Sequence, residues 1–464
     1  MVLIVFAGEA TKSVAATPAS PLPPESQKGD AGVAATKFPF FDYGGTVEQF
    51  EAQIAKFEPA DVAGFRKYLE HSKKIFDVGF TQLGDQPFDK FTTMLKCAPD
   101  LIRLQSYKTV YGLAKKYIKN DLLRRVFSFQ PLLVGGNPFN TTSIYSLIFY
   151  LERQWGVRFA MGGTGAIVRG LERLMREEGI EIQLGEEVER IEMLDEIQYA
   201  SGKRPKLKKP IPRFLHLKSG ERLSLMWEES HWSMPYGWTR PLLVFNADTP
   251  HVYDKLIDFK YRKGIAPRRI ASMKYSMGLF VLYFGTTKQY PDVAHHTIVL
   301  GHAYKELITK LFDTLELETE DLSVYLHRPT ATDPSMAPAG CESFYCLVPV
   351  PNLQSGHDWA EWGPKVRDAT VKYLERAVLP GLSECIVDDF YVTPKHFEQN
   401  LNTLHGTGFS IAPIFSQSAW FRFHNKAPGI DGLYFVGAGT HPGAGMPGVL
   451  CSAKVLDRLI PAVR

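Results

Sequence analysis

Apolar residues recur at three- and four-residue spacing through the first third of the chain, a pattern typical of amphipathic helices. The spacing predicts a helix that starts near Pro59 and buries Phe65 and Phe76, and further helices around Leu122–Phe127 and 143–154. Nine phenylalanines lie in this part of the chain: Phe40, Phe41, Phe65, Phe76, Phe80, Phe127, Phe129, Phe139 and Phe149. We expect them in the core, and the alternative is the wall of a pocket for a long apolar ligand.

The sequence of the middle of the chain predicts one helix followed by two groups of strands. A glycine-rich turn at 161–170 leads into a helix that ends at Gly179 and whose apolar stripe is expected to face inward. The stripe consists of Ile167, Val168, Leu171, Leu174 and Met175. Apolar or alternating runs predict strands at 181–184, 188–193 and 241–245, and then at 271–284, 323–326 and 342–350. This order indicates part of a nucleotide-binding layer, followed by a second sheet.

The most informative stretch lies near the C-terminus, at Gly432–Ser452. Leu433–Val436 has the pattern of a buried strand, and it ends in Gly437-Ala-Gly439, where the backbone can approach a partner closely. Residues 443–448 fit the pattern G-x-G-x-x-G and lead into the last helix. They do not open a Rossmann unit, because the chain ends at Arg464, before an acidic ribose ligand could follow. The free N–H groups of this helix suit a flavin or a pyrophosphate, and a turn that binds nothing is the alternative.

The composition of the chain argues against nucleic-acid binding, a membrane-spanning segment and a secretory signal. The 464 residues carry a net charge of +3, with 45% hydrophobic and 22% charged residues. Basic and aromatic residues do not alternate in runs, so nucleic-acid binding is not expected. No apolar run is long enough to span a membrane, Val2–Ala7 is too short for a secretory signal, and 15–35 has the composition of a linker. We expect a cytoplasmic or peripheral membrane protein.

The pattern of cysteines and histidines does not indicate a metal site. Five cysteines are too few and too scattered for a disulfide framework, and Cys341 and Cys346 are interpreted as strand residues. His295 and His296 are adjacent, and neighbouring residues of one strand point to opposite faces, which argues against shared coordination. The sequence therefore predicts no metal ligand.

Several separate patches resemble the bacterial-type phytoene desaturases, carotenoid enzymes of the FAD-dependent amine-oxidase superfamily. The resemblance is unbroken over Gly432–Ser452, and the other patches follow in the family's order. They are Leu133–Phe139, Trp155–Val157, Gly162–Ile167, Tyr283–Gly285 and Gln417–Phe421. The resemblance implies an α/β fold, in which a glutathione-reductase-type FAD-binding domain, with its N-terminal βαβ unit missing, is interrupted by an α+β substrate domain.

The resemblance also implies a domain organisation and a set of FAD contacts. Residues 1–37 are expected to be a disordered or atypical segment. The substrate domain is expected to comprise 38–157, its helical part, and 251–415, which contains a mixed sheet. The FAD-binding domain is expected to comprise 158–250, with insertions, and 416–464, its C-terminal segment. The expected contacts of FAD are Val188, Gly437, Ala438, Gly439, Thr440, Met446, Pro447, Gly448 and Val449. No side chain is singled out as catalytic, because the flavin carries the chemistry.

The implied function is desaturation of a linear, phytoene-like polyene by hydride transfer to FAD, with a quinone or oxygen as the electron acceptor. Two alternatives stay open: a truncated or inactive member that does not hold FAD, and a related isomerase, ketolase or retinol saturase. Family members begin with a strand and a G-x-G-x-x-G turn, and here Val2–Gly8 resembles the strand alone. We therefore expect residues 1–464 to bind FAD weakly or not at all. A side chain at Gly448 is expected to displace the flavin ring and leave the fold in place.

A basic segment precedes an aromatic one in the middle of the chain. The basic residues are Lys203, Arg204, Lys206, Lys208 and Lys209. The aromatic segment Trp227–Trp238 follows closely. Together they are expected to dock on an anionic bilayer, from which a polyene would be drawn, and a solvated charged loop is the alternative.

Overall fold

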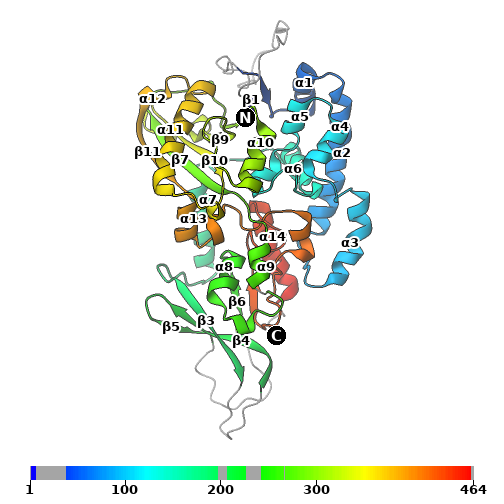
Figure 1. The fold of residues 1–464 in the computed structure, drawn as a ribbon, viewed down its shortest axis with the longest axis vertical. Coiled ribbons are helices and arrows are strands. Elements are labelled where there is room, and N and C mark those ends of the chain that lie inside the picture. Colours follow the sequence, from blue (N-terminus) through cyan, green and yellow to red (C-terminus); the bar gives the residue numbers. More distant parts are fainter. Residues whose placement is uncertain (1, 7–37, 197–205, 226–241, 266, 461–464) are drawn as a thin grey trace.

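The structure is a computed structural model, which describes residues 2–6, 38–196, 206–225, 242–265 and 267–460. The molecule is elongated (Figure 1). A large sheet with its helices forms one end, and a small sheet of three strands forms the other. The C-terminal helix α14 (Met446–Leu459) lies between them.

The large sheet contains seven described strands in the order β11-β7-β10-β9-β8-β1-β2. Their bounds are Ile386–Val392 (β11), Gly278–Thr286 (β7), Glu342–Val350 (β10), Val324–His327 (β9), His296–Leu300 (β8), Val2–Phe6 (β1) and Phe40–Asp42 (β2). Neighbouring strands are antiparallel, except that β1 and β8 run parallel. The strands predicted at 271–284, 323–326 and 342–350 are confirmed, although the first begins only at Gly278.

Strand β1 belongs to the large sheet and not, as its sequence indicates, to a dinucleotide-binding unit. The run Val2–Phe6 resembles the opening strand of a dinucleotide-binding unit, yet it pairs with β8 and β2 in the large sheet. Leu3 to Phe6 are buried there, between helices on both faces. An apolar strand predicts burial but does not specify its partner, and this is why the sequence could not place it. Residues 7–37, including the expected linker, lie outside the described residues.

Helices cover both faces of the large sheet. One face packs against α11, and the other against the N-terminal helices and α10. The bounds are Val47–Phe57 (α1), Asp61–Phe76 (α2), Phe91–Arg103 (α3), Val110–Tyr117 (α4), Asp121–Val126 (α5), Leu147–Trp155 (α6), Tyr304–Thr309 (α10), Trp359–Ala377 (α11) and Leu382–Cys385 (α12). The three helices predicted in this region are confirmed as α2, α5 and α6, the last preceded by a 3-10 turn at Ser143–Ser146.

Phenylalanine rings form the core beneath the N-terminal helices. Phe65, Phe127 and Phe149 are completely buried and pack against one another, with ring centroids 5.1 Å apart for Phe127 and Phe149. Phe41 and Phe50 continue the same cluster. These rings therefore fill a core, and for them the alternative of a ligand pocket is wrong.

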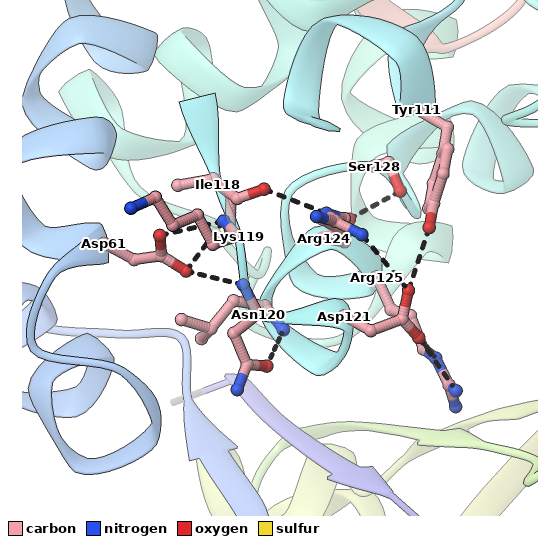
Figure 2. Close-up of polar contacts among 10 residues, drawn as sticks. Asp61, Tyr111, Ile118, Lys119, Asn120, Asp121, Arg124, Arg125 and Ser128 are labelled. Atoms are coloured by element: carbon pink, nitrogen blue, oxygen red, sulfur yellow. Dashed lines mark hydrogen bonds and ion pairs between the residues drawn. The ribbon is translucent and has the colours of Figure 1, made fainter. Parts of the chain in front are cut away.

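A buried carboxylate joins α2 to the turn between α4 and α5 (Figure 2). Asp61, at the first position of α2, is 1% exposed and accepts the backbone N–H of Lys119 at 2.8 Å and that of Asn120 at 2.8 Å. Asn120 in turn caps α5 by accepting the N–H of Leu123 at 3.1 Å. One side chain thus fixes the path of the chain between three helices.

We expect Asp61→Ala to lower the free energy of unfolding by about 2–4 kcal/mol, because it leaves two buried backbone donors without an acceptor. Asp61→Asn keeps one acceptor oxygen and should lose less. The control is Asp100→Ala, which removes a surface pair with Arg103 and should cost no more than about 1 kcal/mol. Urea unfolding measures all three, and equal effects of Asp61→Ala and Asp100→Ala would contradict this role.

Two smaller sheets lie towards the other end of the molecule. Leu243–Phe245 (β6) and Leu433–Phe435 (β12) pair in parallel, and Val188–Glu196 (β3), Lys206–Leu217 (β4) and Arg222–Ser224 (β5) form an antiparallel sheet. The remaining helices are Thr164–Glu177 (α7), Thr249–His251 (α8), Pro267–Ser272 (α9) and Pro394–Leu401 (α13). The strand predicted at 188–193 is confirmed, and the one at 241–245 appears as β6.

Two expectations for the segment around α7 are wrong. Residues 181–184 do not form a strand, and Leu184 is 85% exposed. The helix predicted after Gly162 forms as α7, but its apolar stripe faces outward, with Val168 62% and Leu171 50% exposed. The stripe lacks a cover among the described residues, so its periodicity predicts the helix correctly and its burial wrongly.

Within the described part of the chain, none of the helices is both long and apolar enough to cross a membrane. Lys203, Arg204 and all of Trp227–Trp238 lie outside the described residues, whereas Lys206, Lys208 and Lys209 belong to β4. Lys209 is described, in β4, and pairs with Asp431 at 3.7 Å. At least one of the five expected lipid contacts therefore has a protein partner.

Candidate functional site: the glycine loop before the last helix

The glycine block lies at the carboxyl end of a parallel strand pair. Strands β6 and β12 run side by side, with Leu433 opposite Leu243 and Phe435 opposite Phe245. Because both strands end at the same edge, Asn246-Ala-Asp248 and the loop from Gly437 meet there. The carboxyl edge of parallel strands is the usual place for a ligand in α/β folds.

Two glycines of the block are required by the packing between these loops. Gly437 has φ +99°, and a Cβ there would lie 2.6 Å from the Oδ1 atom of Asn246. A Cβ at Gly439 would lie 2.7 Å from the Oγ1 atom of Thr249. The glycines therefore bring the loop onto the end of β6, in addition to any approach to a cofactor.

Arg422 holds the loop from beneath. It is 1% exposed, and its guanidinium donates to the carbonyl of Thr440 at 2.9 Å and to that of Ala438 at 2.5 Å. It also donates to the carbonyls of Gln417 and Ile411. Burial lowers the pKa of Arg422, but a guanidinium stays charged at neutral pH. A fixed positive charge therefore lies directly behind the glycine loop.

Asn425 also holds the loop, by hydrogen bonds to residues on both sides of it. Its amide nitrogen donates to the carbonyl of His441 at 2.9 Å and to that of Phe435 at 3.2 Å. Neither Arg422 nor Asn425 is among the residues predicted from the sequence. Both lie within four residues of the patch Gln417–Phe421, but an arginine or asparagine in a loop gives no sign that it will be buried.

Helix α14 starts directly above this loop. Its first turn contains Met446, which is 59% exposed, and Pro447, which has no N–H to leave unpaired. Ser452, one turn further, accepts the N–H of Gly437 at 2.9 Å and donates to the carbonyl of Val449 at 2.5 Å. The helix start is thus fixed against the loop, and its free N–H groups form a positive end suited to an anionic group.

The expectation for Gly448 needs a correction. A Cβ at Gly448 would lie 2.8 Å from the carbonyl oxygen of Gly443, which is part of the same loop. A larger residue would therefore displace the loop backbone itself, and the surrounding fold would not stay in place as expected. Loss of flavin in such a variant would not report a contact with the ring.

Val188 lies apart from the loop along the chain but on the same core. It opens β3, is half-buried, and packs against a cluster that contains Phe245, Leu433 and Phe435. The structure therefore brings the strand of Val188 and the strand that carries the glycine loop together through one hydrophobic cluster. All the other predicted contacts, from Gly437 to Val449, lie in the loop or in the first turn of α14.

The titratable groups around the loop are buried and shifted. Burial raises the pKa of Asp248 to about 6, although Ser410 donates to its carboxylate at 2.5 Å. Burial lowers the pKa of His441 to about 4, and its Nδ1 atom has no hydrogen-bond partner among the described residues. At pH 7 His441 is neutral, whereas Asp248 is mostly ionised and offsets part of the charge of Arg422, so the free N–H groups of α14 are the main attraction for an anionic partner. An open helix start above a buried cation fits the phosphates or the reduced ring of a flavin.

Comparison with known proteins agrees with this geometry. Residues 331–454 match the model of the flavin containing amine oxidoreductases. The chain is 42% identical to a lycopene-forming phytoene desaturase of Pantoea ananas, over 90% of this chain and 80% of that protein. It is 38% identical to a neurosporene-forming phytoene desaturase of Rhodobacter capsulatus, over 89% of this chain and 74% of that protein.

Solved structures show the fold. A putrescine oxidase bound to putrescine superposes with a TM-score of 0.50 at 10% identity, covering 87% of this chain and 76% of that one. At this identity the similarity concerns architecture alone, and it confirms the predicted fold of a flavin oxidoreductase. The family itself follows from the two desaturases at 42% and 38% identity. The chain belongs to the phytoene desaturase family of FAD-dependent oxidoreductases.

Proposed function

We propose that this chain desaturates a linear, phytoene-like C40 polyene in carotenoid biosynthesis, with FAD as the hydride acceptor. The Pantoea and Rhodobacter relatives are phytoene desaturases by name. A row of aromatic rings on the large sheet supports the proposal most directly, because a long apolar substrate needs a long apolar surface.

The row crosses five strands at one register position. Phe390 pairs with Tyr283, Tyr283 with Tyr345, Tyr345 with His327, and His327 with His296. Residues paired across neighbouring strands point to the same face, so the five rings stand side by side. At a strand spacing of about 4.8 Å, they extend over roughly 19 Å.

The two ends of the row differ in exposure. Phe390 is 61% and Tyr283 36% exposed, and their rings stack with centroids 4.7 Å apart. The row then descends through Tyr345, half-buried, to His327, whose ring stacks on that of Tyr345 at 4.6 Å. The exposed end offers flat aromatic faces to a conjugated chain, and contacts of this kind are favourable beyond the area they bury.

The residues of the chain have three tasks in this reaction. When bound, FAD supplies the hydride acceptor that an unactivated polyene requires. The loop at Gly437–Thr440 and the start of α14 at Met446–Val449 would hold the flavin, and Val188 would face its adenine end. The aromatic row would orient the polyene and exclude water from it.

We expect an FAD-loaded form of the protein to convert phytoene in lipid vesicles, with a quinone present, into products that absorb at longer wavelength. Tyr283→Ala and Phe390→Ala should each lower the rate about tenfold, equivalent to about 1.4 kcal/mol of lost contact. Absorption spectra and chromatography of the extracted pigments measure this.

Tyr107→Ala is the matched control, because Tyr107 is also an exposed aromatic residue, at 65%, but is not part of the row. Equal rates for all three variants would mean that the row does not bind the substrate. Rearranged or oxygenated products would favour the alternatives of an isomerase or a ketolase, and saturated products a retinol saturase.

We also propose a quinone or oxygen as the electron acceptor and an anionic membrane surface as the source of the substrate. Omitting each acceptor in turn, under argon or in air, distinguishes the first two. Neutralising Lys203, Arg204, Lys206, Lys208 and Lys209 should reduce co-sedimentation with anionic vesicles at low salt. Unchanged sedimentation would exclude this segment as the membrane contact.

A further inference from the structure

Three histidines meet at the covered end of the aromatic row. One ring nitrogen of His295, one of His296 and one of His327 all lie within 4.8 Å of one another. The ring centroids are 4.3 Å apart for His295 and His296, and 4.6 Å apart for His295 and His327. Phe159 packs over the group, 4.7 Å from the ring of His295.

The prediction that the adjacent residues His295 and His296 cannot share a ligand is wrong, because the two residues do not lie on one strand. Strand β8 begins at His296, so His295 precedes it and is not confined to the opposite face. His327 comes from the neighbouring strand β9, directly opposite His296. Only the pairing of β8 with β9 brings the third histidine close, and spacing along the sequence cannot show that pairing.

Hydroxyl groups orient all three rings through the same nitrogen. The Nδ1 atom of His295 shares a hydrogen bond of 2.5 Å with the hydroxyl of Thr332. The hydroxyl of Tyr325 lies 2.7 Å from the Nδ1 atom of His296 and 3.0 Å from that of His327. Hydrogen bonds of this kind to the second ring nitrogen are a regular feature of metal-binding histidines.

The protons can be assigned consistently with a bound cation. The hydroxyl oxygen of Tyr325 has two lone pairs, so it can accept one Nδ1–H from His296 and one from His327. His296 and His327 then carry their protons on Nδ1, and the Nε2 lone pair of each is free. The Nε2 atom of His295 is buried and has no hydrogen-bond partner among the described residues.

The charge around the cluster is also compatible with a cation. Burial lowers the pKa of His295, His296 and His327, which favours the uncharged rings that a metal ion requires. The positive charge of Arg328, next along the chain, is paired with Glu342 at 2.7 Å. Arg328 therefore adds no unpaired positive charge next to His327.

We propose that His295, His296 and His327 bind one divalent transition-metal ion, for which Zn²⁺ is the probe. Three imidazole nitrogens suit zinc and its neighbours, and three protein ligands leave a coordination position open. Zn–N bonds of about 2.05 Å require ligand nitrogens about 3.4 Å apart, so the rings must draw closer by roughly 1 Å. His296 and His327 also form the covered end of the aromatic row, and metal binding there can be measured without the desaturation reaction.

The test is a Zn²⁺ titration of the full chain after treatment with a chelator, in competition with a chromophoric zinc indicator. We expect one Zn²⁺ per chain, and binding at least about a hundredfold weaker in His296→Gln and in His327→Gln. Tyr325→Phe, which removes the orienting hydroxyl, should weaken binding by about 10–100-fold. His357→Gln is the control, because His357 is also half-buried and bonds a carbonyl, that of Leu315, at 3.3 Å.

A second measurement on the unaltered protein guards against variants that fail to fold. With ¹⁵N-labelled histidine, Zn²⁺ should shift the Nε2 resonances of three rings and leave that of His357 in place. Cobalt(II) at the same site should give the intense visible bands of a four-coordinate ion. Undiminished zinc affinity in both ligand variants, or unshifted histidine resonances in the unaltered protein, would overturn the proposal.

Discussion

Replacing Arg422 with leucine is expected to lower the free energy of unfolding by about 3–5 kcal/mol and, in a form of the protein that holds FAD, to abolish flavin retention. The guanidinium is completely buried and donates to the carbonyls of Thr440, Ala438, Gln417 and Ile411. Each buried carbonyl left without a donor costs about 1–3 kcal/mol, and removing a buried charge returns part of that. The loss falls on the loop that carries the predicted flavin contacts, because two of the four carbonyls belong to it.

One further variant separates the geometry of Arg422 from its charge, and a second serves as a surface control. Arg422→Lys keeps the charge but cannot reach four carbonyls at once, so an intermediate effect is expected. Arg458→Leu removes a surface arginine that pairs with Asp85 at 2.9 Å, and it should cost at most about 1 kcal/mol. Urea unfolding and flavin fluorescence measure stability and retention. A stability of Arg422→Leu within about 1 kcal/mol of the unaltered protein would show that the loop does not depend on this residue.

The fold could be predicted where local periodicity decides it. The alternation of Glu342–Val350 and the helical spacing of Phe65 and Phe76 are both properties of one segment, and both predictions are confirmed. The partner of Val2–Phe6 and the exposure of Leu171 depend on which other segments are near. Local pattern carries no information on that, which explains both errors.

In the candidate site, too, features of one segment could be predicted, and contacts between distant segments could not. The glycines of 437–448 could be found from the sequence because missing side chains mark a tight loop. The packing that requires glycine at these positions could not be predicted. It depends on contacts of Gly437 with Asn246 and of Gly439 with Thr249, which join segments almost two hundred residues apart. The same holds for Arg422, and for His327 opposite His296. Residues that act by supporting a loop have no motif of their own.

The outward stripe of α7 bears on how the chain holds its cofactor. Among the described residues, Ile167, Val168, Leu171 and Leu174 are 37–62% exposed on one helix face. An apolar stripe of this width usually packs against another element. The helix follows the turn at Gly162 and Gly163, in the part of the chain that resembles a nucleotide-binding layer. A dinucleotide-binding unit of the kind found at the start of family members would fit this face.

We expect a polypeptide of residues 1–464 to bind FAD at least about a hundredfold more weakly than a fusion that places the N-terminal part of the Pantoea ananas relative before it. Residues 1–464 contain the pattern G-x-G-x-x-G once, in the loop before α14. A second cradle would add several charge-assisted N–H contacts to the phosphates, and each is worth about 1.5–3 kcal/mol. Two such contacts already account for a factor of a hundred. Titration of FAD followed by flavin fluorescence measures both forms.

Leu171→Gln provides the internal control, because it acts on α7 and not on the cofactor loop. In residues 1–464 the side chain is 50% exposed, so the substitution should change the free energy of unfolding by less than about 0.5 kcal/mol. In the fusion the same substitution should cost about 2 kcal/mol, since the added unit would cover the stripe. If residues 1–464 alone retain one flavin per chain through purification, the glycine loop and α14 suffice to hold FAD, and the second cradle is not required for binding.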